Sequence, residues 1–490
     1  MRRFFVKNII FIVAINILVK PVWVFFIDRV VQNRVPHGDY GTYQALLSLG
    51  IIFQIVLDFG ITSYNSRTIA RDPDQLPTVF PAMLSARLVL MGLYMLLGYG
   101  WGWLLGYRGW ELNLLLGILL FQSLTSLLAF IRSNIAALHR FKTDGILSIT
   151  DRLMMVLICG FLLIYPPTAH NFKIEWFVIT QAACYFITAV IAYLVLRRIS
   201  KVKLKFSFHL PTVMSIIRQS LPYAILIFQM SIYNRADAMM IERMCADGKT
   251  QADIWASAFR LLDMVNILGL MFATMLLPMY GRMLSNKQDV QPIVKLCANL
   301  LLPLSFVVAA AGIFFSGDIM NLLYKGANES NLHEYRMVFS WLIASFPAWC
   351  LMYIYSTLLT ANGDLKILNY IALGGVVVNL SLNFYLIPHF SATGGAITSF
   401  ITQSSLAIAF VIACTKVLKL QTNVKWIMAL LGYLVIVVGL AYGIITWLPA
   451  MWLIQAIVFF ISCLLFMFIF RFVSIAAVKQ LMNRNNADNE

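Results

Sequence analysis

Long apolar stretches follow one another along almost the whole chain, separated by short polar segments. Each stretch is about 20 residues long, enough for a helix rising ~1.5 Å per residue to cross a hydrocarbon layer ~30 Å thick. The pattern predicts fourteen membrane-spanning helices near residues 8–28, 43–64, 79–105, 112–134, 147–165, 174–196, 220–242, 254–280, 296–316, 337–360, 366–387, 393–414, 425–447 and 450–472. No segment between them could hold a folded soluble domain, so we expect an all-α polytopic membrane protein.

The composition supports a membrane protein, and the distribution of Lys and Arg residues predicts its orientation in the membrane. The 490 residues are 61% hydrophobic and 12% charged, whereas soluble domains are about a quarter charged. A net charge of +16 could indicate nucleic-acid binding, but most of the 37 Lys and Arg residues fall on the side of the N-terminus when the spans alternate. This positive-inside bias places both termini in the cytoplasm and explains the charge without a nucleic acid.

The spans divide into two similar sets of six and a final pair. The turn at Asp144, between spans four and five, has a sequence similar to that of the turn at Asp364, between spans ten and eleven. The two turns are about 220 residues apart. Because six is even, the two copies would share one membrane orientation, as in parallel repeats. The predicted domains are an N-terminal six-helix lobe at 1–196, a basic cytoplasmic linker at 197–219, a C-terminal six-helix lobe at 220–415, and accessory helices 13 and 14 with a cytoplasmic tail at 416–490.

Charged residues interrupt several of the spans, and each is a functional candidate because a charge at membrane depth is costly. Lys20 lies near the middle of the first span and Arg235 at a similar depth in the seventh, so each predicted lobe contributes a cation. The substrate-binding candidates are Lys20, Arg87, Arg235, Arg260, Asn16 and Asn234. The ion-coupling candidates are Asp58, Asp237 and Asp263.

The mainly cationic character of this set favours an anionic substrate. The planar arginine side chain suits phosphate because it can donate two parallel hydrogen bonds, and the aspartates suit coupling to H+ or Na+. A structural alternative remains open, in which Arg235 and Asp237 form an ion-pair network between helices with Arg260 and Asp263. Asp58 and Arg87 could likewise pair, or each could face a water-filled cavity.

Other chemistry is poorly supported by the sequence. The segment Asp247–Thr250 contains Gly-Lys-Thr, but Arg243 stands where a phosphate-binding loop requires glycine. All six histidines lie in loops or at span ends, which gives no intramembrane histidine metal site. We therefore expect no metal and no cofactor apart from a coupling ion.

Several short motifs carry a family resemblance over residues 1–415. They are Tyr40-Gly41-Thr42-Tyr43, Leu57-Asp58-Phe59-Gly60 leading to Arg67 and Arg71, Leu221-Pro222 with Asp237 further on, Asn379 through Asn383 to Ile387-Pro388, and Gly394-Gly395-Ala396. With six, six and two spans, the chain resembles the polysaccharide (O-antigen type) flippases of the multidrug/oligosaccharidyl-lipid/polysaccharide exporter superfamily.

The resemblance implies a function, a location and partners. Two lobes would surround a cavity that opens alternately inward and outward. The cavity would move an undecaprenyl-diphosphate-linked oligosaccharide from the inner to the outer leaflet of the bacterial cytoplasmic membrane, driven by an ion gradient. The partners would be this lipid-linked substrate, membrane lipid and glycan polymerase or assembly proteins, and a monomer would be able to function.

Two alternatives remain open: another transporter with the same fold, and an enzyme from a different functional class. A multidrug/cation antiporter would have the same fold, but its site should be net acidic, whereas the intramembrane charges here are net basic. A membrane-embedded glycan polymerase or glycosyltransferase would need a large outward loop for its chemistry. The longest outward loop, between residues 317 and 336, is short, which favours a transporter over an enzyme.

Overall fold

A computed structural model gives the fold, and in its described part every regular element is a helix. It describes residues 23–472 apart from positions 37, 63–64, 66–68, 70–71, 139, 166, 168–171, 201–209, 325–328, 422–423 and 471. The chain divides into two compact units, Met1–Ala256 and Ser257–Glu490. The predicted lobe boundary at 197–219 falls partly outside the described residues and stays a prediction.

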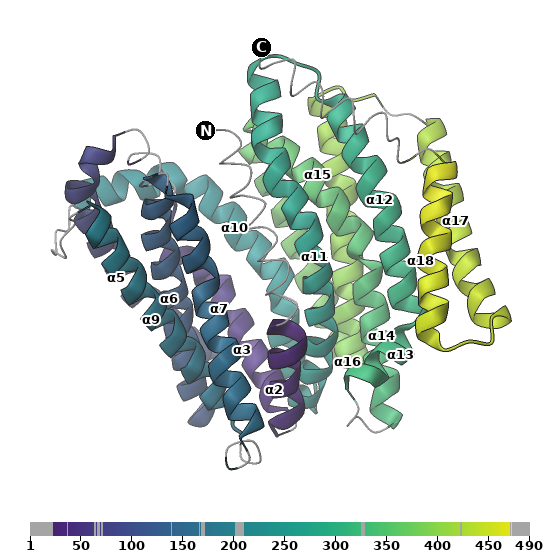
Figure 1. The fold of residues 1–490 in the computed structure, drawn as a ribbon, viewed down its shortest axis with the longest axis horizontal. Coiled ribbons are helices and arrows are strands. Elements are labelled where there is room, and N and C mark those ends of the chain that lie inside the picture. Colours follow the sequence, from purple (N-terminus) through teal and green to yellow (C-terminus); the bar gives the residue numbers. More distant parts are fainter. Residues whose placement is uncertain are drawn as a thin grey trace. The chain divides into compact units, whose positions relative to one another are not determined.

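The first unit begins with short helices and continues with long ones (Figure 1). Its elements are η1 (Trp23–Asp28), α2 (Arg29–Arg34), α3 (Asp39–Phe53), η2 (Gln54–Leu57), η3 (Pro73–Gln75), α5 (Leu76–Leu104), α6 (Trp110–Ala137), α7 (Phe141–Ile164), α9 (Ile174–Ser200) and α10 (Leu210–Met244). Helix α11 (Gly248–Ser285) starts in this unit and ends in the second one, because the boundary follows Ala256.

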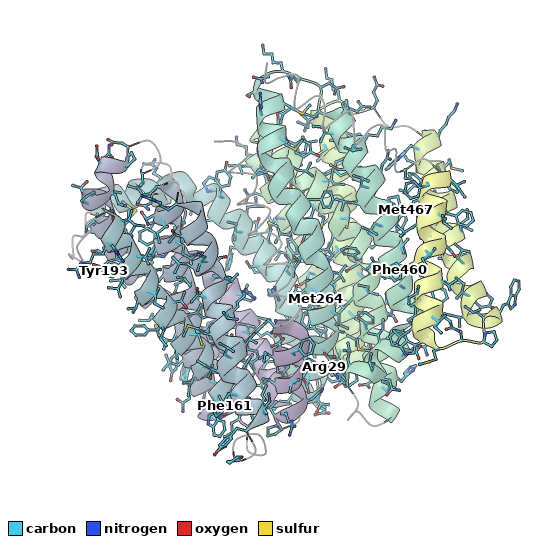
Figure 2. The ribbon with its side chains drawn as sticks, viewed as in Figure 1. Arg29, Phe161, Tyr193, Met264, Phe460 and Met467 are labelled. Carbon is cyan, nitrogen blue, oxygen red and sulfur yellow. The ribbon has the colours of Figure 1, made fainter. Side chains whose placement is uncertain are left out.

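The helices of the first unit pack around α6, which lies against α3, α5, α7 and α9. Helix α10 packs along α3, although the two are separated by more than 150 residues of sequence. The sides that face the neighbouring helices are apolar and buried, whereas the opposite sides expose large apolar residues such as Phe161 (Figure 2). This distribution is what a helix requires when its outer side faces lipid.

The second unit contains the remaining helices. They are α12 (Gln291–Phe314), α13 (Ser316–Leu323), α14 (Glu329–Ala344), α15 (Phe346–Asn362), α16 (Leu365–Val417), α17 (Val424–Trp447) and α18 (Trp452–Ile469). Helices α17 and α18 pack on each other and on α12. On α18, Met467 is buried while Phe460, seven residues earlier, is 37% exposed (Figure 2). The accessory pair predicted at the end of the chain is therefore a helical hairpin that packs on α12.

Helix α16 is two antiparallel arms rather than one rod. A straight helix of its 53 residues would be about 80 Å long, more than twice the thickness of a hydrocarbon layer. Ser391 breaks it with a positive φ of 51°. A Cβ on Gly394 would lie 2.3 Å from the Leu386 carbonyl oxygen, and one on Gly375 would lie 2.7 Å from Leu406 Cδ2. The second arm thus folds back along the first, as the spans predicted at 366–387 and 393–414 require.

Ten helices of the described residues are long and apolar enough to cross a membrane. The number differs from the predicted fourteen for identifiable reasons. Helix α16 counts once although it has two arms, and the first predicted span lies mostly outside the described residues. Helices α10 and α11, which hold the spans predicted at 220–242 and 254–280, are not among the ten. Fourteen spans and two repeated lobes therefore stay predictions, whereas the all-helical polytopic fold is confirmed.

Candidate functional site

Helix α3 is interrupted within the span predicted at 43–64. It ends at Phe53, continues as the 3-10 turn η2, and then reaches Phe59 and Gly60 with positive φ values of 40° and 81°. The backbone returns to helix at Ile61 and Thr62. The expectation of one continuous helix here was wrong. Non-helical backbone at this depth is tolerated only where protein or water satisfies its polar groups.

Polar side chains from neighbouring helices bind the backbone of α3 ahead of the break. The Tyr94 hydroxyl on α5 lies 3.0 Å from the Gly50 carbonyl oxygen and 2.5 Å from Gln122 Oε1 on α6. Gln122 Nε2 donates to the Leu47 carbonyl oxygen at 3.2 Å. All three helices are thus joined by buried or partly buried hydrogen bonds just ahead of the point where α3 loses its regular pattern.

Asp58 lies in the break itself and pairs with Arg87 from α5. Arg87 Nη1 is 2.9 Å from Asp58 Oδ1 and donates to Thr62 Oγ1 at 2.8 Å, while Nη2 donates to Ser126 Oγ on α6 at 2.7 Å. The backbone N–H of Thr62 donates to Asp58 Oδ1 at 3.1 Å, and the Thr62 hydroxyl donates to the same oxygen. The carboxylate thereby caps the helical turn that follows the break.

The two partners differ in exposure. The Arg87 side chain is 2% exposed and its guanidinium carbon lies 5.1 Å from the centroid of the Phe130 ring, whereas the Asp58 side chain is 30% exposed. Of the alternatives considered from the sequence, the geometry favours a pair. Only Asp58 offers surface from which an ion or a proton could be exchanged.

The other predicted site residues lie on α10 and α11. Asn234 and Arg235 are half-buried and Asp237 is fully buried on α10, within the first unit. Arg260 and Asp263 are half-buried on the part of α11 that belongs to the second unit, three residues apart on one helix face. Lys20 and Asn16 lie outside the described residues. Their roles in binding and coupling stay predictions.

A charged cluster that was not predicted from the sequence surrounds the turn between α10 and α11. We call it the turn cluster, and its members are Tyr107, Glu111, Glu242, Arg243 and Lys249. Arg243 Nε is 3.1 Å from Glu242 Oε2 and its Nη2 is 3.4 Å from Glu111 Oε2, while Lys249 Nζ is 3.0 Å from Glu111 Oε1. The Tyr107 hydroxyl donates to Glu242 Oε2 at 2.8 Å.

The cluster is compact and partly buried. The Arg243 guanidinium carbon lies 3.4 Å from the centroid of the Tyr107 ring, a cation–π contact, and the Glu242 side chain is 2% exposed. Burial, together with the nearby Glu242 carboxylate, raises the pKa of the Tyr107 hydroxyl, so this group stays protonated and acts as a donor. Glu111 and Tyr107 come from the α5–α6 region, and the cluster therefore fastens the turn to it.

The start of α11 also rests on α2 and α3. Gln32 Nε2 donates to Asp253 Oδ1 at 2.6 Å and to the Asp253 carbonyl oxygen at 3.2 Å. A Cβ on Gly41 would lie 2.3 Å from the Lys249 carbonyl oxygen and 2.6 Å from the Asp253 backbone nitrogen. Only glycine permits this approach of two backbones, which gives a packing role to one residue of the Tyr40–Tyr43 motif.

We expect Gly41→Ala to lower the free energy of unfolding by about 1–3 kcal/mol, the usual cost of an added methyl group in tight packing. The obstructing atoms are backbone atoms of α11, so α3 and α11 must move apart. The measurement is the apparent Tm of the purified protein in detergent. Gly92→Ala on α5 is the matched control, because a Cβ there meets nothing within 4 Å. Equal Tm values for the two variants would contradict the packing argument.

Comparison with known sequences identifies the family. A family model described as polysaccharide biosynthesis protein matches residues 5–284, more than half of the chain. The chain belongs to the polysaccharide biosynthesis protein family. The resemblance inferred from the short motifs is confirmed. No curated protein sequence matches the chain.

Solved structures show the same fold at low sequence identity. Lipid II flippase MurJ in an inward closed conformation matches with a TM-score of 0.72 and 13% identity, covering 94% of this chain and 98% of that one. An inward-facing multidrug resistance MATE family transporter of the MOP superfamily matches with a TM-score of 0.62 and 15% identity, covering 80% and 94%. A MOP superfamily transporter from Pyrococcus furiosus matches at 0.56 and 12% identity, covering 85% and 97%. This family member is a multi-pass membrane protein and shares the fold of these solved structures.

Proposed function

We propose that the protein flips an undecaprenyl-diphosphate-linked oligosaccharide from the inner to the outer leaflet of the bacterial cytoplasmic membrane. The observation that carries the proposal is the fold match to a lipid II flippase over 94% of the chain, with a higher TM-score than that of the multidrug transporter described above. Membership of a polysaccharide biosynthesis family supports a glycan as the cargo. The protein is a transporter in this proposal, and it works beside glycan polymerase or assembly proteins.

The intramembrane cations would hold the diphosphate. Arg235 and Arg260 are the first candidates because both are half-buried, on the helices α10 and α11 that hold the spans predicted at 220–242 and 254–280, and guanidinium groups bind phosphate oxygens in pairs. Lys20, Asn16 and Asn234 would complete the polar lining. Arg87 is committed to Asp58, and its part is to hold that carboxylate in the break of α3.

The aspartates would couple transport to an ion gradient. Asp58 has accessible surface and lies where the backbone of α3 is irregular, an arrangement suited to exchange of H+ or Na+. Asp237 and Asp263 are the second and third candidates for binding the coupling ion. One charge that crosses the membrane potential supplies about 2.3 kcal/mol per 100 mV, enough to favour one of two conformations.

The turn cluster fits a transporter that alternates between two conformations. Helix α10 and the start of α11 belong to the second of the lobes predicted from the sequence, yet they pack with α2, α3 and α6 in the first compact unit. Under the positive-inside orientation the turn cluster lies at the extracytoplasmic end of the first unit. Opening toward the outer leaflet would require the ion pairs of Glu111 to separate.

The double substitution Arg235→Gln/Arg260→Gln tests the proposal. The host is a bacterial strain without its own flippase, rescued by this protein, and the measurement is surface glycan at equal amounts of membrane-inserted protein. We expect at least a tenfold loss of export, since two charge-assisted contacts of ~1.5 kcal/mol or more each would be removed. The control is Lys287→Gln/Arg336→Gln, which removes two cations from exposed positions.

Two outcomes would overturn the proposal. Wild-type export by the Arg235/Arg260 variant would show that these arginines do not bind the cargo. The MATE fold match keeps a cation antiporter as the second candidate. Failure to rescue export of several glycans, together with proton-driven drug efflux from membrane vesicles, would favour that antiporter.

A further inference from the structure

A cavity of about 540 Å³ lies in the second unit, where α12 and α17 begin and α16 ends. Its volume falls within the range of about 300–1,000 Å³ that is typical of small-ligand sites. All of these helix ends are on one side of the predicted membrane, the cytoplasmic side. None of the candidate residues for transport lines the cavity.

Hydrogen bonds between the helix ends hold the walls of the cavity in place. Gln291 Nε2 on α12 donates to the Gln421 carbonyl oxygen at 3.2 Å, and the Gln421 backbone N–H donates to Gln291 Oε1 at 3.2 Å. Trp426 Nε1 at the start of α17 donates to Asn299 Oδ1 on α12. The accessory hairpin and α12 therefore form a fixed rim around the opening.

The polar part of the lining is positively charged. Lys295 from α12 and Lys425 from α17 both line the cavity and are exposed, and Tyr355 and Thr415 add hydroxyl groups. No aspartate or glutamate is among the lining residues, and among the described residues neither lysine has a salt-bridge partner. The cavity thus carries two uncompensated positive charges and favours an anion.

The rest of the lining is hydrocarbon and leads onto the surface of α17. Val294, Val411 and Val424 line the cavity beside the lysines. From Val424 an exposed apolar stripe follows one side of α17 through Met428, Leu431, Val435 and Val438. A free inorganic anion would gain nothing from this stripe, whereas an amphiphile would place its headgroup at the lysines and its acyl chains along the helix.

We propose that this cavity binds the phosphate headgroup of an acidic phospholipid of the cytoplasmic leaflet. Basic pockets between transmembrane helices on that side are suited to anionic headgroups, and each lysine near the membrane surface adds roughly fivefold to the affinity. The lipid bridges α12 and α17 and so fastens the accessory hairpin to the rest of its unit. This site is separate from the proposed transport path.

The test is lipid-dependent thermal stability of the purified full-length protein in detergent. Dioctanoyl phosphatidylglycerol should raise the Tm in a saturable way, because a ligand that binds only the folded state stabilises it by mass action. Dioctanoyl phosphatidylcholine at equal concentration should not. In Lys295→Gln/Lys425→Gln the half-saturating concentration should rise about 25-fold.

Lys366→Gln/Lys419→Gln is the matched control, since these exposed lysines lie at the same end of the unit and do not line the cavity. It should bind as the wild type does. Native mass spectrometry supplies a second measurement, in which the cavity variant should retain less phosphatidylglycerol than the control.

Four results would each overturn the proposal. The control could lose as much affinity as the cavity variant, which would indicate a diffuse charge effect. Phosphatidylcholine could stabilise the protein equally, which would indicate that binding depends on the acyl chains and not on the headgroup charge. Inorganic phosphate could suffice, which would indicate a site for free anions. An isoprenyl phosphate could bind far better than phosphatidylglycerol, which would assign the cavity to the cargo.

Discussion

Arg87→Met is expected to lower the free energy of unfolding by about 2–3 kcal/mol, at or just below the lower end of the ~3–5 kcal/mol that breaking a buried ion pair usually costs. The guanidinium donates to Asp58, Thr62 and Ser126, and its removal leaves the Asp58 carboxylate without its cation in the break of α3. The cost stays at the low end because Asp58 is 30% exposed and water can partly replace Arg87. The measurement is the apparent Tm in detergent.

Related variants separate this pair from a general effect of charge. Asp58→Asn should cost less than Arg87→Met, because the amide oxygen still accepts from Arg87 and from the Thr62 backbone. The double variant Asp58→Leu/Arg87→Met should recover part of the loss, because it leaves neither charge alone. Strict additivity of the effects of Asp58→Leu and Arg87→Met, each also measured as a single variant, would show that the pair is not coupled. Arg336→Gln, at an exposed position, should leave the Tm unchanged.

Glu111→Gln is expected to open the turn cluster and to reduce export. Glu111 lies between Arg243 and Lys249, and without its charge the ion pairs with both cations are lost. The reporter is Cys245 in the α10–α11 turn, which is half-buried while the other six cysteines are buried. Labelling of intact cells by a membrane-impermeant maleimide should become about fivefold faster, equivalent to the ~1 kcal/mol that a half-exposed ion pair contributes.

Two controls define this experiment. Cys245→Ser should abolish labelling, which assigns the signal to that residue. Asp318→Asn removes an exposed carboxylate on the same predicted side of the membrane and should leave the rate unchanged. An unchanged rate in Glu111→Gln would show that the turn cluster does not limit opening. Labelling of Cys245 only from the cytoplasmic side would reverse the predicted orientation.

The long helices could be predicted because an apolar run of fixed length has few other solutions in a membrane. The span expected at 79–105 is α5 (Leu76–Leu104), and the span expected at 174–196 is α9 (Ile174–Ser200). The break in α3 was missed because its apolar residues continue through it. Asp58 followed by Gly60 was the available signal, since an aspartate can cap a new turn and a glycine accepts a positive φ.

The candidate site, too, has a part that could be predicted from the sequence and a part that could not. Asp58 and Arg87 could be nominated from depth alone, and pairing was one of two alternatives that only the coordinates could separate. The turn cluster could not be found from depth, because its charges lie near span ends, where charged residues are ordinary. Glu111 and Arg243 are 132 residues apart in the chain, and nothing local to either one indicates the other.

The folded-back arms of α16 have a consequence for how the protein enters the membrane. The close approaches at Gly375 and Gly394 set a register in which Asn379 lies level with Thr402, and Asn383 with Thr398, all fully buried. If the first arm entered the bilayer alone, Asn383 Nδ2 would still donate to Asn379 Oδ1, but the remaining amide atoms would face hydrocarbon, at a cost of several kcal/mol. Insertion of the two arms together avoids that state. We therefore expect the translocation machinery to release residues 365–417 into lipid as one hairpin.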